Sequence, residues 1–589
     1  MNIHADRISK LRALMASKGW DAVIVPGSDP HQSEYPALRW KQVEWLTGFT
    51  GEAADVGVTD SHAGLWTDTR YFIQAGIQLA GTGVELHKTR VPEQVLIPEW
   101  LRMNLPPDAV VAVDSLCQSV AAVDGLSAAF ELAMVPDLLS AIWPDRPQVP
   151  QTPVFRVNSG ETRAEKLDWL RAEMQERGCD ACLLTALDEI AWMLDVRASD
   201  IEYNPLVISY LLVLQDGAKW FVLKDEDCDD PVSDQTFEAL ADDGVSILPY
   251  DGIRTELASL CCERILADDS TLSAELREYL SCQALFQPSP VQLRKAVKNP
   301  TEIQGMRSVH LDDGVAMEKF LYWLEKSIMA DRAVSEWDAA LKLGRFRSQI
   351  EDYQGDSFET ISAYGPGAAL PHYSTPHTGA PMLEPHGLYL CDSGGQYLRG
   401  TTDITRTVPL GECTPEERLD YTLVLKGHIA LAMAVFPVGT PGCRIDALAR
   451  MPLWMHGRNF GHGTGHGVGS FLGVHEGPQD IRQNLNGTPL MEGMVVSDEP
   501  GLYREGRHGI RHENLLLVQE AGSTVFGHFL KFETLTLCHI DTSCIEPGIL
   551  NREEVDWLNA YNARVYEELA PSLQPDERLW LSEKTAPIR

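Results

Sequence analysis

Two stretches far apart in the chain share one pattern of hydrophobic and polar positions. Residues 7–22 and 166–181 align without a gap, and each is typical of an amphipathic helix that ends at a basic residue followed by glycine. An apolar run follows each helix, at 22–26 and at 181–185, and predicts a buried strand. Because a repeated helix–strand unit indicates a duplication, we predict two related α/β domains.

The pattern changes beyond residue 290, where longer helices alternate with short, glycine-rich strands. Asn299 is expected to cap a helix, and Glu302 completes a capping box with it. Ser335 and Thr414 open two further helices with the same kind of signal, and the second should run to about residue 434. We therefore predict a third domain of the α+β class, an antiparallel sheet wrapped by helices.

The expected domain boundaries follow from these pattern changes. The stretch 144–153 is rich in proline, which fixes φ and donates no backbone hydrogen bond, so it predicts a linker. The expected division is a first α/β domain at 1–150, a second at 151–290, the α+β domain at 291–535 and a C-terminal extension at 536–589.

Length, composition and charge exclude several classes of protein. A chain of 589 residues is too long for one hydrophobic core, and 44% hydrophobic with 23% charged residues is typical of folded proteins. The formal net charge of −36 disfavours nucleic acids and anionic membrane surfaces as partners. Nowhere do 18 apolar residues follow one another, so no membrane-spanning helix is predicted. We expect a cytoplasmic protein with neither nucleic-acid nor membrane partners.

Twelve cysteines are scattered along the chain at low density. The one CxxC motif, Cys179 to Cys182, has no second pair at the spacing of a zinc site. We interpret these cysteines as reduced thiols of the core, with a redox or zinc role as the less favoured alternative.

Four carboxylates of the third domain lie at or near buried strands. Asp392 ends an apolar strand, and a Ser-Gly-Gly turn joins it to a threonine-rich strand that carries Asp403. Glu499 ends another apolar strand, and Glu513 lies in a strand built to be buried. Gathered carboxylates repel unless cations neutralise them, and two divalent ions about 3.5 to 4 Å apart would do so. Arg511, two residues before Glu513, is expected to orient that carboxylate from behind.

Glycine-flanked histidines add a second kind of ligand. His462 and His466 are four residues apart, but the interleaved glycines disfavour a helix and let the backbone and a ligand approach closely. His475 follows nine residues later. A role in metal or substrate binding and a role as ordinary loop residues both stay open for these histidines.

With these residues assembled, the third domain resembles the pita-bread metallopeptidases of family M24, which include methionine aminopeptidase, aminopeptidase P and prolidase. The motifs that carry the resemblance are DSGGQYLRGTTDITRT at 392–407, GHGTGHGVG at 461–469, SDEPGLY at 497–503 and GIRHEN at 509–514. The positions that match the family's metal ligands are Asp392, Asp403, His466, Glu499 and Glu513. The resemblance implies that Asp392 binds one ion, that His466 and Glu499 bind the other, and that Asp403 and Glu513 bridge them.

Further motifs resemble the long, three-domain, cytosolic form of aminopeptidase P. They are DPHQSEY at 29–35, WTDTRYF at 66–72, SDIEYNP at 199–205 and KNPTE at 298–302. This resemblance covers nearly the whole chain and implies two creatinase-like α/β domains before a pita-bread catalytic domain. It implies an Xaa-Pro aminopeptidase, acting as a homodimer on peptides whose second residue is proline. It also implies two divalent ions, most often Mn²⁺, with Zn²⁺, Co²⁺ or Fe²⁺ as other occupants.

The same resemblance assigns the remaining catalytic roles. His372 in LPHYS, His462 and His475 match the family's substrate histidines. In the implied mechanism a hydroxide bridging the metals attacks the scissile carbonyl, and the metals with a histidine stabilise the oxyanion. Glu499 then carries a proton to the proline nitrogen. Two residues depart from the family pattern, His512 in place of an aliphatic residue and Glu202 in place of a small or apolar one.

Two other functions stay open. Prolidase shares the ligands but cleaves only dipeptides, and it resembles a shorter version that lacks the second repeat. A non-catalytic binding protein on this fold would have lost the ligands, and creatinase uses the fold without metal. All five ligand positions are intact here, which favours the aminopeptidase.

Overall fold

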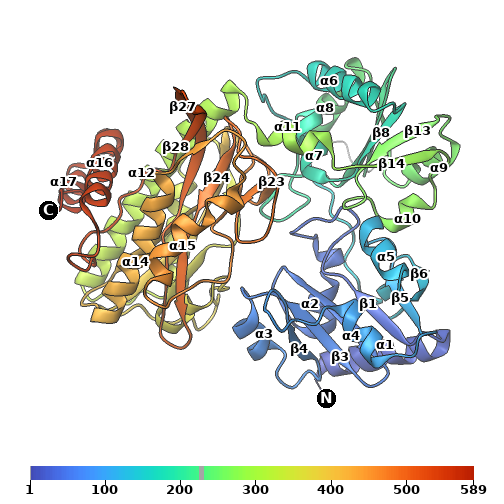
Figure 1. Ribbon diagram of the computed structural model, residues 1–589, viewed down its shortest axis with the longest axis horizontal. Coiled ribbons are helices and arrows are strands. Elements are labelled where there is room, and N and C mark those ends of the chain that lie inside the picture. The colour runs from blue at the N-terminus through green and yellow to red at the C-terminus, as the bar shows by residue number, and fades with distance from the viewer. Residues whose placement is uncertain (1, 224–230) are drawn as a thin grey trace. The chain divides into compact units, whose positions relative to one another are not determined.

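Two six-stranded sheets of identical strand order make up the N-terminal unit, Met1–Gln292 (Figure 1). The computed structural model describes residues 2–223 and 231–589. The strands of the first sheet are β1 (Ala22–Val25), β2 (Ala54–Thr59), β3 (Ala63–Thr67), β4 (Glu85–Lys88), β5 (Val110–Asp114) and β6 (Glu131–Val135). Those of the second are β8 (Ala181–Leu184), β10 (Ser209–Leu214), β11 (Ala218–Val222), β12 (Val245–Pro249), β13 (Arg264–Ala267) and β14 (Gln283–Phe286).

The two sheets confirm the duplication predicted from the repeat. Their orders are β4-β3-β2-β1-β5-β6 and β12-β11-β10-β8-β13-β14. In each sheet the strand after the repeated helix, β1 or β8, has one antiparallel neighbour and one parallel neighbour. The helices of this unit are α1 (Ile3–Lys18), α2 (Gln42–Thr47), α3 (Phe72–Gln78), α4 (Ile97–Asn104), α5 (Val120–Ser127), α6 (Arg163–Glu176), α7 (Leu187–Leu194), α8 (Pro231–Asp242), α9 (Gly252–Ser259) and α10 (Ala274–Arg277).

The repeated helices end where the sequence predicts. Gly19 caps α1 with a φ of 72°, a left-handed conformation that costs glycine nothing, and Gly178 after α6 has a φ of 64°. Leu11 of α1 and Leu170 of α6 are fully buried. The linker prediction at 144–153 falls on a described segment without helix or strand. The predicted domain boundaries stay predictions.

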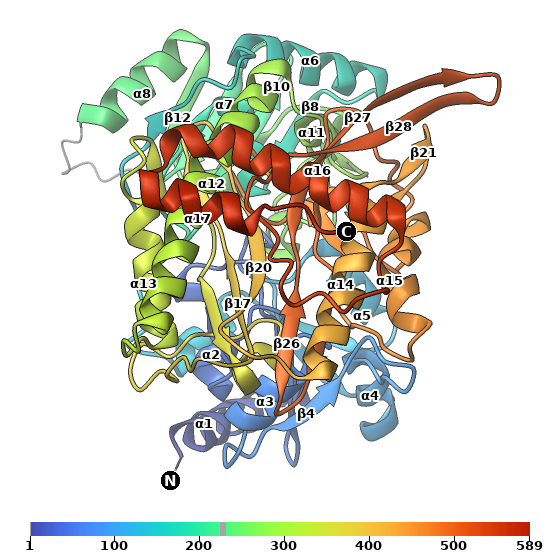
Figure 2. The same ribbon diagram turned by 90° about the vertical axis from the view of Figure 1, so that its left-hand side faces the viewer.

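The predicted helix starts of the C-terminal unit, Leu293–Arg589, are also confirmed. Capping boxes begin α12 (Pro300–Met329), α13 (Glu336–Arg347) and α14 (Pro415–Ala432). The other helices are α15 (Asp446–Trp454), α16 (Arg552–Leu569) and α17 (Pro575–Lys584), while α11 (Pro290–Ala296) contains the boundary between the units. Figure 2 shows α16 and α17 side by side across α12.

Mainly antiparallel strands form the sheets of this unit, as expected for the α+β class. One sheet has the order β16-β17-β20 and another the order β21-β28-β27-β24-β22-β23. The strands are β15 (Tyr353–Asp356), β16 (Ile361–Tyr364), β17 (Leu388–Ser393), β18 (Gly395–Tyr397), β19 (Gly400–Thr401), β20 (Ile404–Pro409), β21 (Val435–Pro437), β22 (Gly465–Gly467), β23 (Glu476–Ile481), β24 (Val495–Asp498), β25 (Gly501–Arg504), β26 (His508–Arg511), β27 (Asn514–Thr524) and β28 (Gly527–Thr534).

Two strand predictions need correction. The chain does not turn directly from Asp392 into the strand with Asp403, because residues 395–401 form a second hairpin, β18 and β19, in another sheet. Asp403 consequently lies one residue before β20 rather than inside a strand. Glu513 likewise lies in the two-residue break between β26 and β27. Because Asp403 and Glu513 lie outside the strands, their side chains need not follow the in-and-out alternation of the neighbouring strand residues.

The C-terminal helices are bound to the sheet through one buried guanidinium. Arg406 on β20 donates to the carbonyl of Cys538 and to the hydroxyl of Tyr561 on α16, each at 2.8 Å. It also donates to Asn514 at the start of β27. A buried cation with this many acceptors is well satisfied, and α16 therefore packs as part of this unit.

The described cysteines are free thiols, but they lie in the core only in part, because Cys261 is exposed and Cys262, Cys282, Cys413 and Cys443 are partly exposed. Cys179 and Cys182 are free thiols, and both are buried. Across residues 2–223 and 231–589, no helix combines the length and the apolar character needed to cross a membrane.

Candidate metal centre

The five side chains predicted as metal ligands come together in the C-terminal unit. Carboxylate oxygens of Asp392, Asp403 and Glu513 lie within 4.8 Å of one another. A second group with the same spacing joins His466, Glu499 and Glu513. Because Glu513 belongs to both groups and His466 Nε2 lies 3.4 Å from Asp403 Oδ2, all five residues form one cluster.

The four carboxylates of this cluster lie at or next to the ends of strands. Asp392 is the penultimate residue of β17, and Asp403 directly precedes β20. Glu499 directly follows β24, as predicted, and Glu513 directly precedes β27. The antiparallel pairs β17–β20 and β24–β27 align these ends, so residues far apart in sequence meet without long loops.

Two glycines allow β22, which carries His466, to lie close to the neighbouring strands β24 and β23. A Cβ atom on Gly465 would lie 1.9 Å from the carbonyl oxygen of Ser497, and one on Gly467 would lie 2.4 Å from that of Glu476. Any other residue would push β22 away from its neighbours β24 and β23. The predicted close backbone approach beside His466 is therefore confirmed.

The ring of His466 is held by a hydrogen bond and faces two of the carboxylates. Its Nδ1 donates to the carbonyl oxygen of Gly467 at 2.9 Å. Its Nε2 lies 3.4 Å from Asp403 Oδ2 and 3.4 Å from Glu499 Oε1. Because Nδ1 is used in this hydrogen bond, Nε2 is the ring nitrogen that faces the two carboxylates, and it is the atom available to a cation shared with them.

Arg511 contacts the cluster differently from the prediction. Its Nη2 donates to Asp392 Oδ2 at 2.5 Å, so its direct partner is Asp392 and not Glu513. It reaches Glu513 through Thr405, which accepts from Arg511 Nε at 3.1 Å and donates to Glu513 Oε2 at 2.8 Å. The prediction placed Arg511 and Glu513 on one face of a single strand. The strand β26 ends at Arg511, so Glu513 does not continue its alternation and the prediction was wrong.

The electrostatics of the cluster require added positive charge. Burial raises the pKa of Asp392, and burial followed by the neighbouring carboxylates raises that of Glu513 well above its ordinary value. Burial also raises the pKa of Glu499 to about 7. Asp392 Oδ1 is buried without a hydrogen-bond partner among the described residues.

These observations fit two divalent cations. With all four carboxylates ionised, as metal ligands are, the cluster and the guanidinium of Arg511 carry three net negative charges, more than one divalent ion balances. The donors are carboxylate oxygens and one imidazole nitrogen, a set that suits Mn²⁺, Fe²⁺, Co²⁺ or Zn²⁺.

The three predicted substrate histidines lie around this cluster. The ring of His475 packs edge to face on that of His466, with centroids 4.4 Å apart. His462 Nδ1 lies 4.0 Å from Glu499 Oε2. Burial lowers the pKa of His462 well below its ordinary value, and the charges of Arg511 and His372 lower it further. His372 is therefore near enough to His462 to act on it electrostatically.

Tyr503 is a site residue that the sequence interpretation missed. Its hydroxyl accepts from Arg511 Nη1 at 2.6 Å and lies 2.7 Å from His462 Nε2. His462 Nδ1 donates to the carbonyl of Gly463, so Nε2 is the acceptor from Tyr503. The signal was present in SDEPGLY, because Gly501 leaves room for the Tyr503 ring, which a Cβ would meet at 2.5 Å.

The two departures from the family pattern lie outside the cluster. His512 is fully buried and packs edge to face on Tyr421, with ring centroids 4.5 Å apart. Burial lowers its pKa well below the ordinary value, so it is a neutral core side chain. The Glu202 side chain is 63% exposed and lies 3.8 Å from Lys41 Nζ.

Comparison with known families covers almost the whole chain. Residues 304–520 match metallopeptidase family M24, and residues 528–588 match the C-terminal region of peptidase M24. Residues 7–143 and 145–302 each match a creatinase/prolidase N-terminal domain. These matches agree with the duplicated N-terminal sheets and with the mainly antiparallel C-terminal unit.

Similar proteins share both length and fold. Aminopeptidase P1 of Arabidopsis thaliana is 36% identical, with 99% of each chain covered. A probable Xaa-Pro aminopeptidase P of Laccaria bicolor is 38% identical over 99% of this chain and 93% of its own. The crystal structure of the X-prolyl aminopeptidase of Caenorhabditis elegans, described as a cytosolic enzyme with a di-nuclear active site, is 37% identical and superimposes with a TM-score of 0.94 over all of both chains.

Proposed function

The chain belongs to metallopeptidase family M24, in its aminopeptidase P branch, and from that premise we propose that it is a metal-dependent Xaa-Pro aminopeptidase. It hydrolyses the bond between the N-terminal residue of a peptide and a proline at the second position. The observation that supports this function is the position of His466 Nε2, 3.4 Å from both Asp403 and Glu499, within a cluster of four carboxylates that a bound cation would stabilise.

Five residues would hold two divalent ions at this centre. Asp392 would bind one ion, His466 and Glu499 the other, and Asp403 and Glu513 would bridge both. When bound, the ions polarise the scissile carbonyl and lower the pKa of a water molecule. Mn²⁺ is the proposed occupant, because carboxylate oxygens dominate the donor set.

The surrounding side chains orient the peptide and move protons. We assign to His475 and His372 the hydrogen bonds to the substrate carbonyls, where negative charge develops during attack. Glu499 is 19% exposed, in contrast to the 2% of Glu513, so it is the carboxylate that meets both solvent and substrate. It carries the proton that the secondary amine of proline needs in order to leave.

Arg511 and Tyr503 hold this arrangement in place. Arg511 offsets part of the effect of burial, which raises the pKa of Asp392, and it fixes the orientation of that carboxylate through the 2.5 Å contact. Tyr503 links Arg511 to His462, so the metal-binding carboxylate and a substrate histidine share one hydrogen-bonded chain. A neutral His462, as its lowered pKa indicates, accepts from Tyr503 and faces substrate without added charge.

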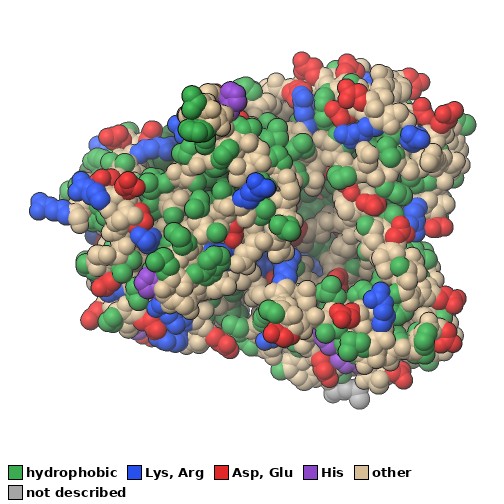
Figure 3. Space-filling view, in the orientation of Figure 1, with side chains coloured by type: hydrophobic (Ala, Val, Ile, Leu, Met, Phe, Trp, Pro, Cys, Tyr) green, Lys and Arg blue, Asp and Glu red, His purple; other side chains and the backbone are tan. Residues whose placement is uncertain are grey.

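A homodimer and a cytoplasmic location complete the proposal. Several large apolar side chains are exposed on α15 and just after α14: Met433, Val435, Val438, Met451, Trp454 and Met455. Figure 3 shows hydrophobic side chains gathered over the face of this unit that carries these helices. A chain with a net charge of −36 needs such a face to associate against its own repulsion. The cytosolic description of the Caenorhabditis elegans enzyme supports the location.

The oligomeric state has a direct test. Light scattering at low micromolar concentration and moderate salt should give about twice the chain mass of 65.3 kDa. Met455→Glu, at a side chain that is 76% exposed, should shift the protein to the monomer without unfolding it. A wild-type monomer would refute the dimer, and a dimeric Met455→Glu variant would refute this face.

Substrate specificity separates the proposed aminopeptidase from a prolidase. The Mn²⁺-loaded protein is incubated with Ala-Pro-Ala, Ala-Pro and Ala-Ala-Ala, and released alanine is measured. The proposal expects cleavage of Ala-Pro-Ala, much slower release from Ala-Pro and none from Ala-Ala-Ala. Cleavage of the dipeptide alone would identify a prolidase, and no cleavage of any peptide would favour a binding protein.

A further inference from the structure

A second group of metal-ligand side chains lies in the first N-terminal sheet, on its edge strand. His62 stands in the short connection between β2 and β3, and Glu85 and His87 belong to β4. β3 and β4 are parallel, with Gly64 opposite Glu85 and Trp66 opposite His87. Because side chains alternate along a strand, the register places Glu85 and His87 on one face, beside His62.

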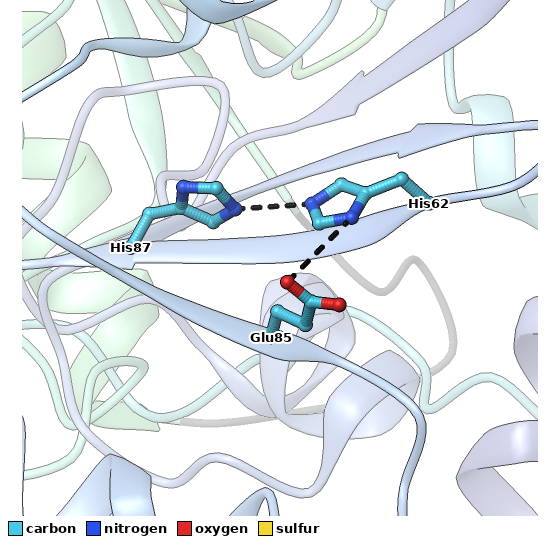
Figure 4. Close-up of side chains that lie close together, drawn as sticks. All are labelled: His62, Glu85 and His87. Carbon is cyan, nitrogen blue, oxygen red and sulfur yellow. Dashed lines mark hydrogen bonds and ion pairs between the residues drawn. The ribbon is translucent and has the colours of Figure 1, made fainter.

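The three side chains lie side by side, and Figure 4 shows His87 facing one ring nitrogen of His62 while Glu85 faces the other. His62 Nε2 lies 3.0 Å from His87 Nε2, and His62 Nδ1 lies 4.0 Å from Glu85 Oε2. One donor atom from each residue falls within 4.8 Å of the other two. Two imidazole nitrogens and one carboxylate oxygen are thus available to a single ligand.

Both imidazole rings are held in place by tryptophans. The ring of His87 stacks on Trp66 with centroids 3.9 Å apart and planes only 8° from parallel. The ring of His62 stacks on Trp100 of α4 at 4.5 Å. Gly64 makes space for both, because a Cβ there would lie 2.7 Å from His87 and 2.8 Å from His62. The two rings are therefore oriented before any ligand binds, which lowers the entropic cost of binding.

The charge state of the group suits a cation. Burial lowers the pKa of His62 and of His87, so both rings are neutral near pH 7 and offer a lone pair. Two facing neutral imidazoles can share only one proton between their Nε2 atoms. Glu85 adds a negative charge and is exposed to solvent, with 75% of its side chain accessible.

We propose that His62, Glu85 and His87 form a third metal position in this protein, for a divalent transition ion of the zinc class. Two nitrogens bound to one tetrahedral zinc ion at about 2.0 to 2.1 Å lie roughly 3.3 Å apart. The observed distance of 3.0 Å between His62 Nε2 and His87 Nε2 would have to increase only slightly for both to bind one ion. The exposed Glu85 side chain supplies the third ligand by a change of rotamer, and water completes the coordination.

The position of the site gives it a structural consequence. β4 is the outermost strand of its sheet and is only four residues long. A bound ion joins this edge strand to the connection between β2 and β3, so it stabilises the edge of the sheet and blocks it from pairing with another chain.

Metal counting on the full-length protein tests the site. The Mn²⁺-loaded protein is dialysed against micromolar Zn²⁺, and both metals are measured by mass spectrometry. The sum of manganese and zinc ions per chain is compared, because exchange of one metal for the other at the catalytic centre does not change that sum. Wild type should bind one more ion per chain than His87→Gln. Glu85→Gln, at an exposed position that does not threaten folding, should bind this third ion at least about tenfold more weakly.

The matched control is His377→Gln. His377 also stacks on a tryptophan, with its centroid 4.0 Å from that of Trp337, and lies 3.4 Å from Glu359, but its described contacts include no second histidine. This variant should keep the full metal content. Equal totals in wild type and His87→Gln, an unchanged zinc affinity in Glu85→Gln, or an equal loss in His377→Gln would each overturn the proposal.

Discussion

Asp403→Asn should change the stability of this protein in opposite directions with and without metal. Asp403 lies within 4.8 Å of carboxylate oxygens of Asp392 and Glu513. Two full charges at that separation repel by about 3 kcal/mol at an effective dielectric constant of 20. Burial and these neighbours already favour protonation of Glu513, so the relief on removing Asp403 is smaller, about 1 to 3 kcal/mol.

The metal-free variant should therefore melt above metal-free wild type. For a unit of the size of Leu293–Arg589 the melting temperature shifts by about 1 to 2 °C for each kcal/mol, so the expected increase is a few degrees. Saturating Mn²⁺ reverses the order, because ions held at 1,000 times their dissociation constant stabilise wild type by about 4 kcal/mol while the variant binds them poorly. Activity on Ala-Pro-Ala should be lost with the metal.

Differential scanning fluorimetry at pH 8, with and without Mn²⁺, measures both effects. Asp313→Asn is the matched control, since Asp313 is also buried but accepts from Arg347 at 2.8 Å and from Tyr397 at 2.5 Å. Leaving Arg347 buried without its partner should cost about 3 to 5 kcal/mol in both states.

The reasoning fails if Asp403→Asn behaves like Asp313→Asn. A variant that is less stable without metal, and that keeps two ions and normal turnover, would show that Asp403 is a structural aspartate.

Further predictions concern the substrate histidines and the response to pH. His475→Ala and His372→Ala should keep near-normal metal content while kcat/KM falls by about 10² to 10³. His466→Ala should lose both bound metal and activity. Metal analysis together with the kinetics separates the two roles, and a loss of metal in His475→Ala would contradict its assignment. Burial would raise the pKa of Asp420, but hydrogen bonds from His508, Arg504 and Arg458 outweigh burial and hold that pKa well below its ordinary value. A carboxyl group with a lowered pKa stabilises the fold above its unfolded-state pKa of about 3.9 and loses this contribution as pH falls further. Urea unfolding should therefore find Asp420→Asn much less stable than wild type at pH 7, with the difference shrinking below pH 4; an unchanged difference at pH 3 would contradict it.

Local signals in the sequence were sufficient for the helices and for the duplication. Capping boxes at Asn299 and Ser335 depend on residues three apart, and both form as predicted. The repeated helix, glycine and strand gave two related sheets because each step is also local. The four carboxylates stood out as candidate ligands because charge in apolar surroundings needs a neutralising partner, whereas the choice of His466 among the histidines depended on the family resemblance.

Contacts between distant strands were beyond the reach of the sequence pattern. Arg511 binds Asp392 through a register between segments 119 residues apart, which spacing along β26 does not reveal. The hairpin of β18 and β19 interrupts the expected turn because its partner, β15, lies earlier in the chain. Thr405 joins the site through Arg511, 106 residues away, and Tyr503 contacts His462, 41 residues away, so spacing in the sequence did not mark either as a site residue.

The central claim is that a dinuclear centre in this chain cleaves the bond before a proline. Its most direct test is the rate of alanine release from Ala-Pro-Ala while Mn²⁺ is titrated into the metal-free protein. The account predicts no release without metal and a rate that rises until two ions per chain are bound at the five ligands. Release by the metal-free protein, or no release with both positions filled, would contradict it.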